Sequence, residues 1–360
     1  MRNATRLLFN AYVSQIALLS NVPDATKTFT VDPVVGQKLE EKIQQSSEFL
    51  SKINSVPVDQ QEGQKVGIGV TRPIAGRTDT SGGVKRPVTD PTDSEELDRY
   101  RCEKTNYDHA IRYAKLDAWA HRPEFQTLIR DVIIKQQGRD RIMIGWNGTS
   151  AAATTDRVAN PLLQDVNIGW LEQIRTKAPA RVMDDGALST APTKAIYVDA
   201  TGEILDAAGS NAATADADYA NIDALAYDAV NLMEEWHRDD TDLVVIVGRD
   251  LVHEKYLNVI NAAGDNAMQQ EARDRILTLP KQVGGKTAIM VPFFPANAML
   301  VTSLDNLAIY TQNGTRRRMV IDRPELDQVE NYESVNEAYV VEDFTRVALV
   351  ENIVMGKKPA

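Results

Sequence analysis

The stretch that most constrains this chain is residues 122–148, which has the pattern of one long amphipathic helix. Its apolar side chains recur every three or four residues, which places them along one side of a helix. They are Phe125, Leu128, Ile129, Val132, Ile133, Ile142, Met143 and Trp146. Pro123 suits the first turn, and Gly138 favours a bend because glycine costs about 1 kcal/mol in a helix. The pattern predicts a rod of about 37 Å, and by itself it also fits the core helix of an α+β enzyme.

Composition excludes several classes of protein. The chain has 360 residues, 43% of them hydrophobic, which is ordinary for a globular protein with more than one packed region. A net charge of −11 argues against a dedicated nucleic-acid binder, because phosphates repel an acidic surface. The single cysteine, Cys102, excludes a disulfide framework and a multi-cysteine metal site. No apolar run approaches the roughly 18 residues that cross a bilayer, so we expect synthesis in the cytoplasm and no membrane partner.

Residues 1–29 differ from the rest of the chain. Three basic residues and one acidic residue give this segment a charge of +2, which leaves −13 on the remaining 331 residues. Asn10, Ser14 and Gln15 interrupt its apolar block, so an amphipathic helix over Arg2–Leu19 is favoured over a signal peptide. Such a segment is either a frayed leader or a basic helix that docks on an acidic surface and can be detached.

Two strand patterns flank a long polar stretch. Val66, Ile68 and Val70 alternate with small residues, and the same period of two returns over Tyr107–Tyr113. Residues 75–99 between them are almost free of apolar side chains and rich in glycine and proline. A loop this long in a compact domain is usually functional or disordered. It is either a solvated hairpin tip or an arm that reaches a neighbouring copy.

The charges of this loop are sorted by sign. Its outgoing limb carries the basic residues Arg72, Arg77, Lys85 and Arg86, opposed only by Asp79. Its return limb carries the acidic residues Asp90, Asp93, Glu95, Glu96 and Asp98. Opposite charges of this kind set the register between two partners more than their affinity, so we expect contacts between subunits here.

The rest of the chain alternates helix and strand patterns. The expected helices are Val34–Ile53, a short one within 162–183, Ile222–Trp236, Leu251–Ile260 and Ala267–Leu279. The expected strands are Leu243–Val247, Thr287–Val291, Met299–Thr302, Leu307–Thr311, Met319–Ile321, Ala338–Glu342 and Arg346–Ile353. We expect the last two to form a hairpin or a paired return into the first region. Residues 184–218 have low complexity and predict a surface excursion.

None of the candidate motifs for catalysis or for cofactor binding is complete. The four histidines lack metal-ligand spacing, and Cys102 has no evident base partner. The sequence Gly284–Thr287 resembles the end of a phosphate-binding loop, but it lacks the earlier glycine and leads into a strand. The run Arg316–Arg318 could touch nucleic acid or the acidic edge of a neighbour. We therefore predict no catalytic, cofactor or metal residues.

Several longer stretches together resemble the major capsid protein of P-two-like tailed bacteriophages, the peduoviruses. They are residues 29–33 (FTVDP), 65–71 (KVGIGVT), 160–171 (NPLLQDVNIGWL), 178–183 (APARVM), 242–251 (DLVVIVGRDL), 292–300 (PFFPANAML) and 329–343 (VENYESVNEAYVVED). They occur in order over nearly the whole chain. The resemblance weakens in 75–99 and 184–218.

The resemblance implies an α+β Hong-Kong-type phage capsid fold with a long spine helix and an α/β axial domain. The implied segments are a cleavable leader helix at 1–29, an N-terminal arm at 30–63, an E-loop hairpin at 64–110, a peripheral domain at 111–195 and 335–360, and an axial domain at 196–334.

The same resemblance implies a function without enzymatic activity. Such proteins assemble as hexamers and pentamers around an internal scaffold that is also the maturation protease, with a portal protein at one vertex. The shell loses its leader, expands and encloses double-stranded DNA without sequence-specific binding, so the protein passes from the host cytoplasm to the virion. By position, the processed bond is near Phe29–Thr30. Two alternatives are a cellular nanocompartment shell of the same fold and a soluble α/β enzyme built on 219–311.

Overall fold

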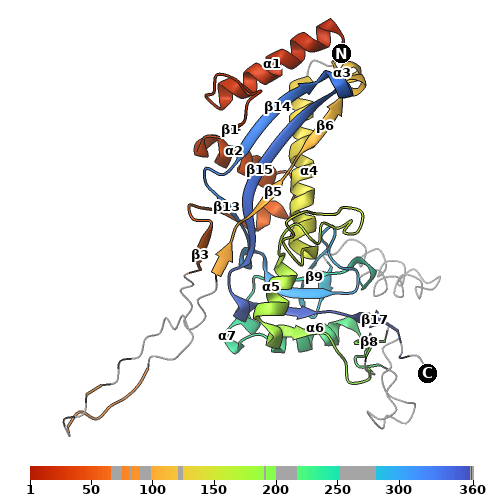
Figure 1. The fold of residues 1–360 in the computed structure, drawn as a ribbon. Helices are drawn as coiled ribbons and strands as arrows, with labels where there is room; N and C mark the ends of the chain where they lie inside the picture. Colours follow the sequence, from red (N-terminus) through yellow and green to blue (C-terminus); the bar gives the residue numbers. More distant parts are fainter. Residues whose placement is uncertain are drawn as a thin grey trace, which may run out of the picture.

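The computed structural model describes residues 1–65, 75–81, 83, 85, 86, 88, 99–120, 125–189, 192–199, 217–251, 281–356 and 358. The seven-stranded sheet lies along the long helix α4, Phe125–Asn147, and the six-stranded sheet lies at the C-terminal end of this helix (Figure 1). The predicted long helix is thereby confirmed for all but its first residues. The expected helices Leu251–Ile260 and Ala267–Leu279 lie outside the described residues apart from Leu251, and so does the strand around Val66–Val70.

The seven-stranded sheet is built on one long strand, β15, Gln328–Val341. Along one edge of β15 lie β14 (Arg317–Arg323) and β13 (Leu307–Gln312), and these carry β1 (Phe29–Thr30) and β2 (Asn54–Val58) outside them. Along the other edge lie β5 (Glu103–Asn106) and β6 (His109–Arg112). The sheet therefore collects strands from both ends of the sequence.

The alternation predicted for Tyr107–Tyr113 is present in the structure. Side chains at odd positions from Thr105 to Tyr113 are buried or half-buried, and those at even positions are exposed. The run is split into two strands at Tyr107 and Asp108, where the Tyr107 N–H donates to the Glu333 carbonyl and the Asp108 carboxylate accepts from the Glu333 N–H. One strand pattern thus became two strands because of this local exchange of partners.

The six-stranded sheet has the order β10-β11-β9-β12-β16-β7. Its strands are β10 (Gln282–Val283), β11 (Lys286–Ile289), β9 (Leu243–Val247), β12 (Met299–Ser303), β16 (Ala348–Val350) and β7 (Val182–Met183). Ile246, Leu300 and Leu349 face the α4 side of the sheet, and Val245 and Val301 face the other side. Burial of both faces explains why β9 has a continuous apolar run.

Short helices cover this second sheet. Helix α6 (Ile222–Asn231) packs on one face through Leu225 and Ala229. Helix α5 (Trp170–Lys177) packs on the other face, and the remaining elements near it are η2 (Pro179–Arg181) and α7 (Glu235–Arg238). A separate two-stranded sheet pairs β8 (Ile196–Val198) with β17 (Ile353–Met355). The remaining short helix, α3, covers Tyr113–Trp119.

An aromatic cluster joins the two sheets at the C-terminal half of α4. The ring centroids of Trp146 and Trp170 are 4.9 Å apart, and those of Trp170 and Tyr339 are 5.4 Å apart. The Trp170 indole N–H donates to the Ala308 carbonyl at 3.0 Å, so its polar atom is satisfied inside the core. Tyr339 and Ala308 belong to the seven-stranded sheet and Trp170 to α5, so this cluster fixes one region on the other.

Three sequence predictions were wrong in detail. The helix expected over Val34–Ile53 ends at Gln44 (α2, Pro33–Gln44), because the chain turns where the Ser46 hydroxyl donates to the Ile43 carbonyl at 2.6 Å. A separate short turn, η1, follows at Leu50–Lys52. The helix expected to reach Trp236 ends at Asn231, where the Arg238 guanidinium donates to two carbonyls at the end of α6.

The third correction concerns the end of the chain. Ala338–Glu342 and Arg346–Ile353 do not form a hairpin, since the first belongs to β15 and the second to β16 and β17 of other sheets. Similarly, within 162–183 the helix covers only Trp170–Lys177, after a turn in which Leu163 has a φ of 58°. The domain limits stay a prediction; the one at 334/335 falls inside the continuous strand β15.

Helix α4 also corrects the expected apolar stripe. Ile129, Ile142 and Trp146 are buried, but Val132 is 54% exposed. The helix runs through Gly138 without interruption. A Cβ at this glycine would lie 2.4 Å from the Ser46 hydroxyl oxygen, so the missing side chain lets the turn after α2 approach the helix. A role of Gly138 as a bending point stays a prediction.

Candidate assembly surfaces

Helix α1, Asn3–Leu19, covers the far end of the seven-stranded sheet (Figure 1). Its buried residues are Thr5, Phe9, Tyr12 and Ile16, spaced four, three and four residues apart. The last three pack in one apolar cluster with Tyr113, Leu116, Ile129, Val320 and Val329. The helix predicted over Arg2–Leu19 is therefore confirmed, and it is docked rather than frayed.

Acidic groups receive the basic start of this helix. The Arg6 guanidinium lies 3.0 Å from the Asp322 carboxylate, and the Arg2 N–H donates to the Asp117 carboxylate at 3.0 Å. Both contacts are partly exposed, so they contribute little to stability and mainly orient the helix. The docking surface that the sequence predicted for a basic helix is present within the same chain.

The predicted processing residues, Phe29 and Thr30, form strand β1. They pair antiparallel with Arg318 and Arg317 of β14, and Phe29 is 9% exposed within the apolar cluster of α1. Thr30 is exposed, and β1 is the outermost strand of the sheet. A protease that needs an extended substrate can reach this bond only after β1 leaves β14. Cleavage here stays a prediction.

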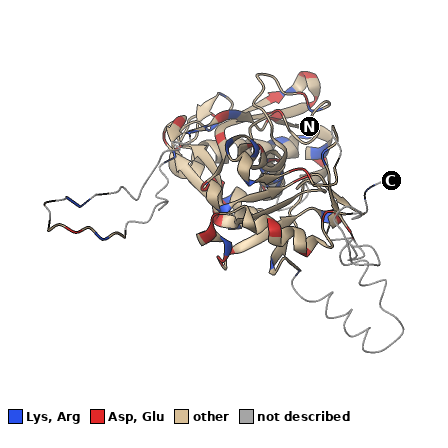
Figure 2. Ribbon diagram, turned by 90° about the horizontal axis from the view of Figure 1, so that it is seen from below, with Lys and Arg blue, Asp and Glu red and all other residues tan. Residues whose placement is uncertain are grey.

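The sorted charges of the E-loop are only partly described. Arg77, Lys85 and Arg86 are exposed, whereas Arg72, Asp90, Asp93, Glu95 and Glu96 lie outside the described residues. The loop leaves the body beside β3 (Glu62–Gln64) and returns at β4 (Arg99–Arg101), which pair antiparallel. In Figure 2 its described basic segments lie well away from the body. Contacts of these residues with another subunit stay a prediction.

A buried ionic cluster lies at the centre of the seven-stranded sheet, and it was not predicted from the sequence. It joins Glu40 of α2, Arg141 of α4, Arg316 and two glutamates of β15, Glu333 and Glu337. The Arg141 guanidinium donates to both Glu40 oxygens, at 2.6 and 3.1 Å, and its Nε donates to Glu337 at 3.1 Å. Arg316 binds Glu40 and Glu333. Four distant segments of the chain meet in this cluster.

Three further groups complete the cluster. The Tyr107 hydroxyl donates to Glu337 at 2.9 Å, the Gln137 amide donates to Glu333 at 3.2 Å, and Arg318 lies 3.4 Å from Glu333. The cluster therefore holds three carboxylates and three guanidinium groups. Such pairing is what buried charges require, because an unpaired one costs several kcal/mol, on the order of 3 to 5.

The cluster lowers the pKa values of Glu40 and Glu333. Burial opposes ionisation of Glu40, but Arg141 and Arg316 outweigh it and lower the pKa of Glu40 to about 2. Burial also opposes ionisation of Glu333, and Arg318 and Arg316 lower its pKa below the usual range. Glu40 and Glu333 thus stay ionised at neutral pH. The cluster is a fastening between α2, α4 and the seven-stranded sheet.

The cluster also settles the role of the arginine run. Arg316 is 4% exposed inside the cluster, Arg318 is half-buried beside Glu333, and Arg317 is exposed. Two of the three are therefore internal, which leaves one for a nucleic acid or for a neighbour. The signal in the sequence is that Glu333 and Glu337 occupy inward positions of a strand whose other inward residues include Val335 and Tyr339.

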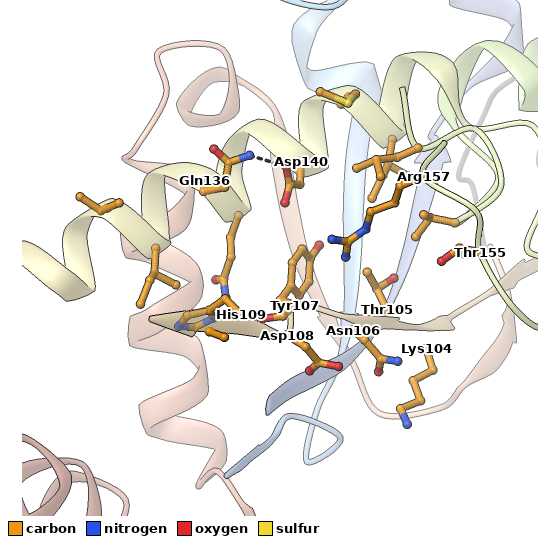
Figure 3. A pocket seen from close by; sticks show the side chains of 18 of the residues that line it. Lys104, Thr105, Asn106, Tyr107, Asp108, His109, Gln136, Asp140, Thr155 and Arg157 are labelled. Carbon is orange, nitrogen blue, oxygen red and sulfur yellow. Dashed lines mark hydrogen bonds between the residues drawn. The ribbon is translucent and has the colours of Figure 1, made fainter. Parts of the chain in front are cut away.

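A groove of about 840 Å³ lies between α4, the outer edge of β5 and β6, and the loop at 152–166 (Figure 3). Ile129, Val132 and Ile133 give it an apolar wall, and Gln136 donates to Asp140 at 2.7 Å within it. Burial raises the pKa of Asp140. The mixture of side chains offers no nucleophile with a base, and the described residues contain no group of three or more potential metal ligands. The groove has the character of a contact surface.

These features describe a chain with an N-terminal helix docked on its seven-stranded sheet and with loop segments that lie away from its body. A family model described as phage major capsid protein, P2 family, matches residues 8–353. The chain belongs to this family. The family is structural and not enzymatic, so the protein is the major capsid protein of a phage head shell and is located in the virion. Within the described ranges, no helix is long and apolar enough to cross a membrane.

Individual relatives agree over the full length of this capsid protein. The capsid protein of Escherichia phage P2 is 46% identical over 361 residues, covering 99% of this chain and 96% of that protein. The major capsid protein of Serratia phage KSP20 is 42% identical, with 99% of each covered. A chain in the solved satellite phage P4 procapsid with size determination (Sid) protein has a TM-score of 0.77 and 44% identity, with 100% of both chains covered. The Hong-Kong-type fold predicted for the capsid protein is therefore confirmed, as is assembly into a shell of many copies.

Proposed function

We propose that this capsid protein forms hexamers and pentamers around an internal scaffold that is also the maturation protease. Proteolysis at or near Phe29–Thr30 then removes residues 1–29, and the shell expands around double-stranded DNA. The observation that supports this proposal is the separate docking of α1 through its own apolar cluster. Assembly begins in the host cytoplasm, and a portal protein occupies one vertex.

The docking of α1 also suggests how cleavage is timed. Phe29 is held in the same cluster as α1, and β1 pairs with β14 through Phe29 and Thr30, with one further backbone hydrogen bond on each side, from the Val31 N–H to the Arg316 carbonyl and from the Val320 N–H to the Ala25 carbonyl. A two-residue edge strand has few hydrogen bonds to lose, so it opens more readily than the strands inside the sheet. Loosening of α1 in the assembled shell would therefore free β1 for the protease. Once residues 1–29 are cut off, the docking of α1 on its own subunit cannot re-form, which makes the expansion of the shell irreversible.

The remaining acidic surface suits enclosure of DNA without tight binding. The chain outside residues 1–29 carries −13 in sequence. Like charges keep packaged DNA from adhering to the wall. Many modest contacts between copies then hold the shell, because closed symmetry multiplies them while each one remains weak enough to correct errors.

Co-expression with the neighbouring head genes tests the proposal. The full chain should give procapsids by negative-stain electron microscopy, and residues 30–360 should give few or malformed ones. Normal procapsids from residues 30–360 would show that the leader is not an assembly element. Loss of residues 1–29 from wild-type shells, located by mass spectrometry of the intact chain, tests the processing site.

The E-loop charges need a separate test. Reversal of Arg72, Arg77, Lys85 and Arg86 to Glu should block or distort the shells, because basic groups that meet acidic ones would then repel them. The matched control reverses Arg99 and Arg101 at the base of the loop. Unchanged particles from the fourfold reversal would remove the loop charges from the account.

A further inference from the structure

Helix α1 has a second stripe, of two leucines and two small residues, that the protein's own body leaves uncovered. Leu7, Ala11, Ser14 and Leu18 are spaced four, three and four residues apart, which is the spacing of the buried stripe shifted by two residues. A shift of two residues turns a helix by about 200°, so the two stripes lie on opposite sides. Leu7 is 73% exposed and Leu18 is 76% exposed, and in Figure 1 the outer side of α1 faces away from the other elements.

This exposure is unusual for a helix that already has a docked side. Leu8 is 37% exposed and Leu19 is 59% exposed, but both lie nearer to the buried stripe than to the outer one, so Leu7 and Leu18 are the large apolar residues of the outer side. A surface helix normally has one apolar face, and contiguous exposed apolar residues mark a site of interaction. The outer stripe therefore needs a partner of its own.

The order of residues in the stripe identifies the partner. Read in either direction the stripe has the same pattern, a leucine, two small residues and a leucine. If a second copy of α1 lies antiparallel, Leu7 meets Leu18 of the second copy and Ala11 meets Ser14 of the second copy. This is the self-complementary arrangement that a twofold axis requires, in which residue i contacts j and j contacts i. The small central residues let the two helix axes approach closely.

The charges favour the same arrangement. No charged residue lies between Arg6 and Asp24, so nothing along the outer stripe repels a second copy. The basic residues Arg2 and Arg6 lie at one end of the helix, and Asp24 follows the other end. Antiparallel pairing places the basic end of one helix beside the acidic end of the other, where the helix dipole is also negative. Parallel pairing would place like charges together.

We propose that the outer stripe of α1 is a twofold contact, through which two copies of this chain pair by antiparallel leader helices. The pairing extends the proposed function by naming the partner of the leader. The inner stripe fastens each helix to its own subunit, and the outer stripe joins two subunits. Removal of residues 1–29 would then break a contact between subunits together with the internal one.

Disulfide trapping between single-cysteine variants tests the orientation. Leu7→Cys and Leu18→Cys change exposed residues, and the native Cys102 is fully buried. Each variant and a one-to-one mixture of the two full-length chains are oxidised mildly and run on non-reducing gels. The mixture should give at least tenfold more covalent dimer than either variant alone. Val158→Cys mixed with Leu326→Cys, at exposed positions 92% and 57% accessible, measures random collision.

Each other outcome contradicts the pairing. Equal dimer from Leu7→Cys alone shows parallel or random contact, dimer at the collision level shows none, and an adduct of another mass shows a different partner protein. A second pair of variants guards against misfolding. Leu7→Glu should reduce dimer formation in sedimentation velocity, and Leu7→Glu with Leu18→Lys should restore it, because the antiparallel contact then joins opposite charges. No restoration would overturn the antiparallel register.

The proposed function has its own readout in the same samples. Shells by electron microscopy without the trapped dimer would overturn the pairing and keep the capsid maturation proposal. Trapped dimer from a chain that never gives procapsids with the head genes would keep the pairing and overturn the capsid maturation proposal.

Discussion

The two large sheets of this capsid protein are stabilised in different ways. The six-stranded sheet is apolar on both faces, and Val245, Ile246, Leu300 and Val301 are fully buried there. The seven-stranded sheet has charged residues at inward positions and depends on α1, α2 and β1 from the start of the chain for part of its cover. The six-stranded sheet takes its cover from apolar side chains that lie outside residues 1–29, and one of its faces shares a core with the seven-stranded sheet. The seven-stranded sheet has a cover that belongs to the N-terminal segments.

The difference shows how one subunit can be both rigid and convertible. An apolar core that excludes water stays closed, whereas a sheet covered by a separate leader helix can lose that helix and gain another cover. The ionic cluster separates the fixed part of the N-terminal region from the exchangeable part. It fastens α2 to α4 and β15, whereas α1 lies outside it. In this account residues after about 32 stay with the sheet and residues 1–29 are exchangeable.

The largest expected effect breaks the fastening at its centre. Arg141→Met leaves Glu40 and Glu337 without their shared partner, so the free energy of unfolding should fall by about 3 to 5 kcal/mol. Urea unfolding of the purified chain measures it. Lys52→Met, which removes the exposed ion pair of Lys52 with Glu48 at 2.8 Å, should cause no measurable change. Equal losses of unfolding free energy in Arg141→Met and Lys52→Met would contradict a stabilising role of the ionic cluster.

Acid should release the same fastening. The pKa of Glu40 is about 2 in the folded chain and near 4.5 when unfolded, so its contribution is complete above pH 4.5 and is lost as pH falls towards 2. The shift corresponds to a loss on the order of 3 kcal/mol. Glu40→Gln should have a flatter dependence of unfolding free energy on pH over this window. A slope identical to that of the wild type would contradict the assignment.

Two glycines in the C-terminal half of α4 compare its contact with the aromatic core and its contact with the turn after α2. A Cβ at Gly145 would lie 2.2 Å from the ring of Trp170, which is fully buried, so Gly145→Ala should cost about 1 to 3 kcal/mol. A Cβ at Gly138 would meet the movable hydroxyl of Ser46, and alanine gains about 1 kcal/mol of helix propensity. Gly138→Ala should therefore be near neutral in thermal unfolding. A larger loss of stability in Gly138→Ala than in Gly145→Ala would show that the aromatic core adjusts to an added methyl group and that the turn after α2 does not.

The smallest effects come from two matched helix caps. Asn221 caps α6 beside the six-stranded sheet, accepting from the Ala224 N–H at 2.8 Å, and Asp32 caps α2, accepting from the Val34 N–H at 2.9 Å. Alanine at either position should cost about 1 kcal/mol. Hydrogen exchange should show faster exchange confined to α2 in Asp32→Ala, and spread over the sheet in Asn221→Ala. The same distribution of faster exchange in both variants would contradict the difference between the two sheets.

The sequence predicted the elements whose apolar pattern is continuous. Helix α4, the leader helix and the buried run Leu243–Val247 follow from periodicity, because each packs through a regular stripe or through both faces of a strand. The resemblance to the capsid family supplied the fold and the function. The ends of α2 and α6 were missed, since side chains of Ser46 and Arg238 decide them by hydrogen bonds that only the folded chain brings together.

The ionic cluster could not be predicted for a related reason. Its residues come from positions 40, 141, 316, 333 and 337, and charged residues in a single sequence read as surface. Only the register of β14 on β15 and the close approach of α2 to α4 at Gly138 make them neighbours. The pairing of β8 with β17 was missed similarly, because three-residue strands carry too little pattern.

Hydrogen exchange by mass spectrometry, on the full chain and on a chain lacking residues 1–29, tests the central claim most directly. The account predicts at least tenfold faster exchange in residues 317–334 of the seven-stranded sheet after the leader is removed, with exchange unchanged in β9 and β12. Equal acceleration in both sheets would show that the leader stabilises the whole fold, and no change in residues 317–334 would show that it covers nothing.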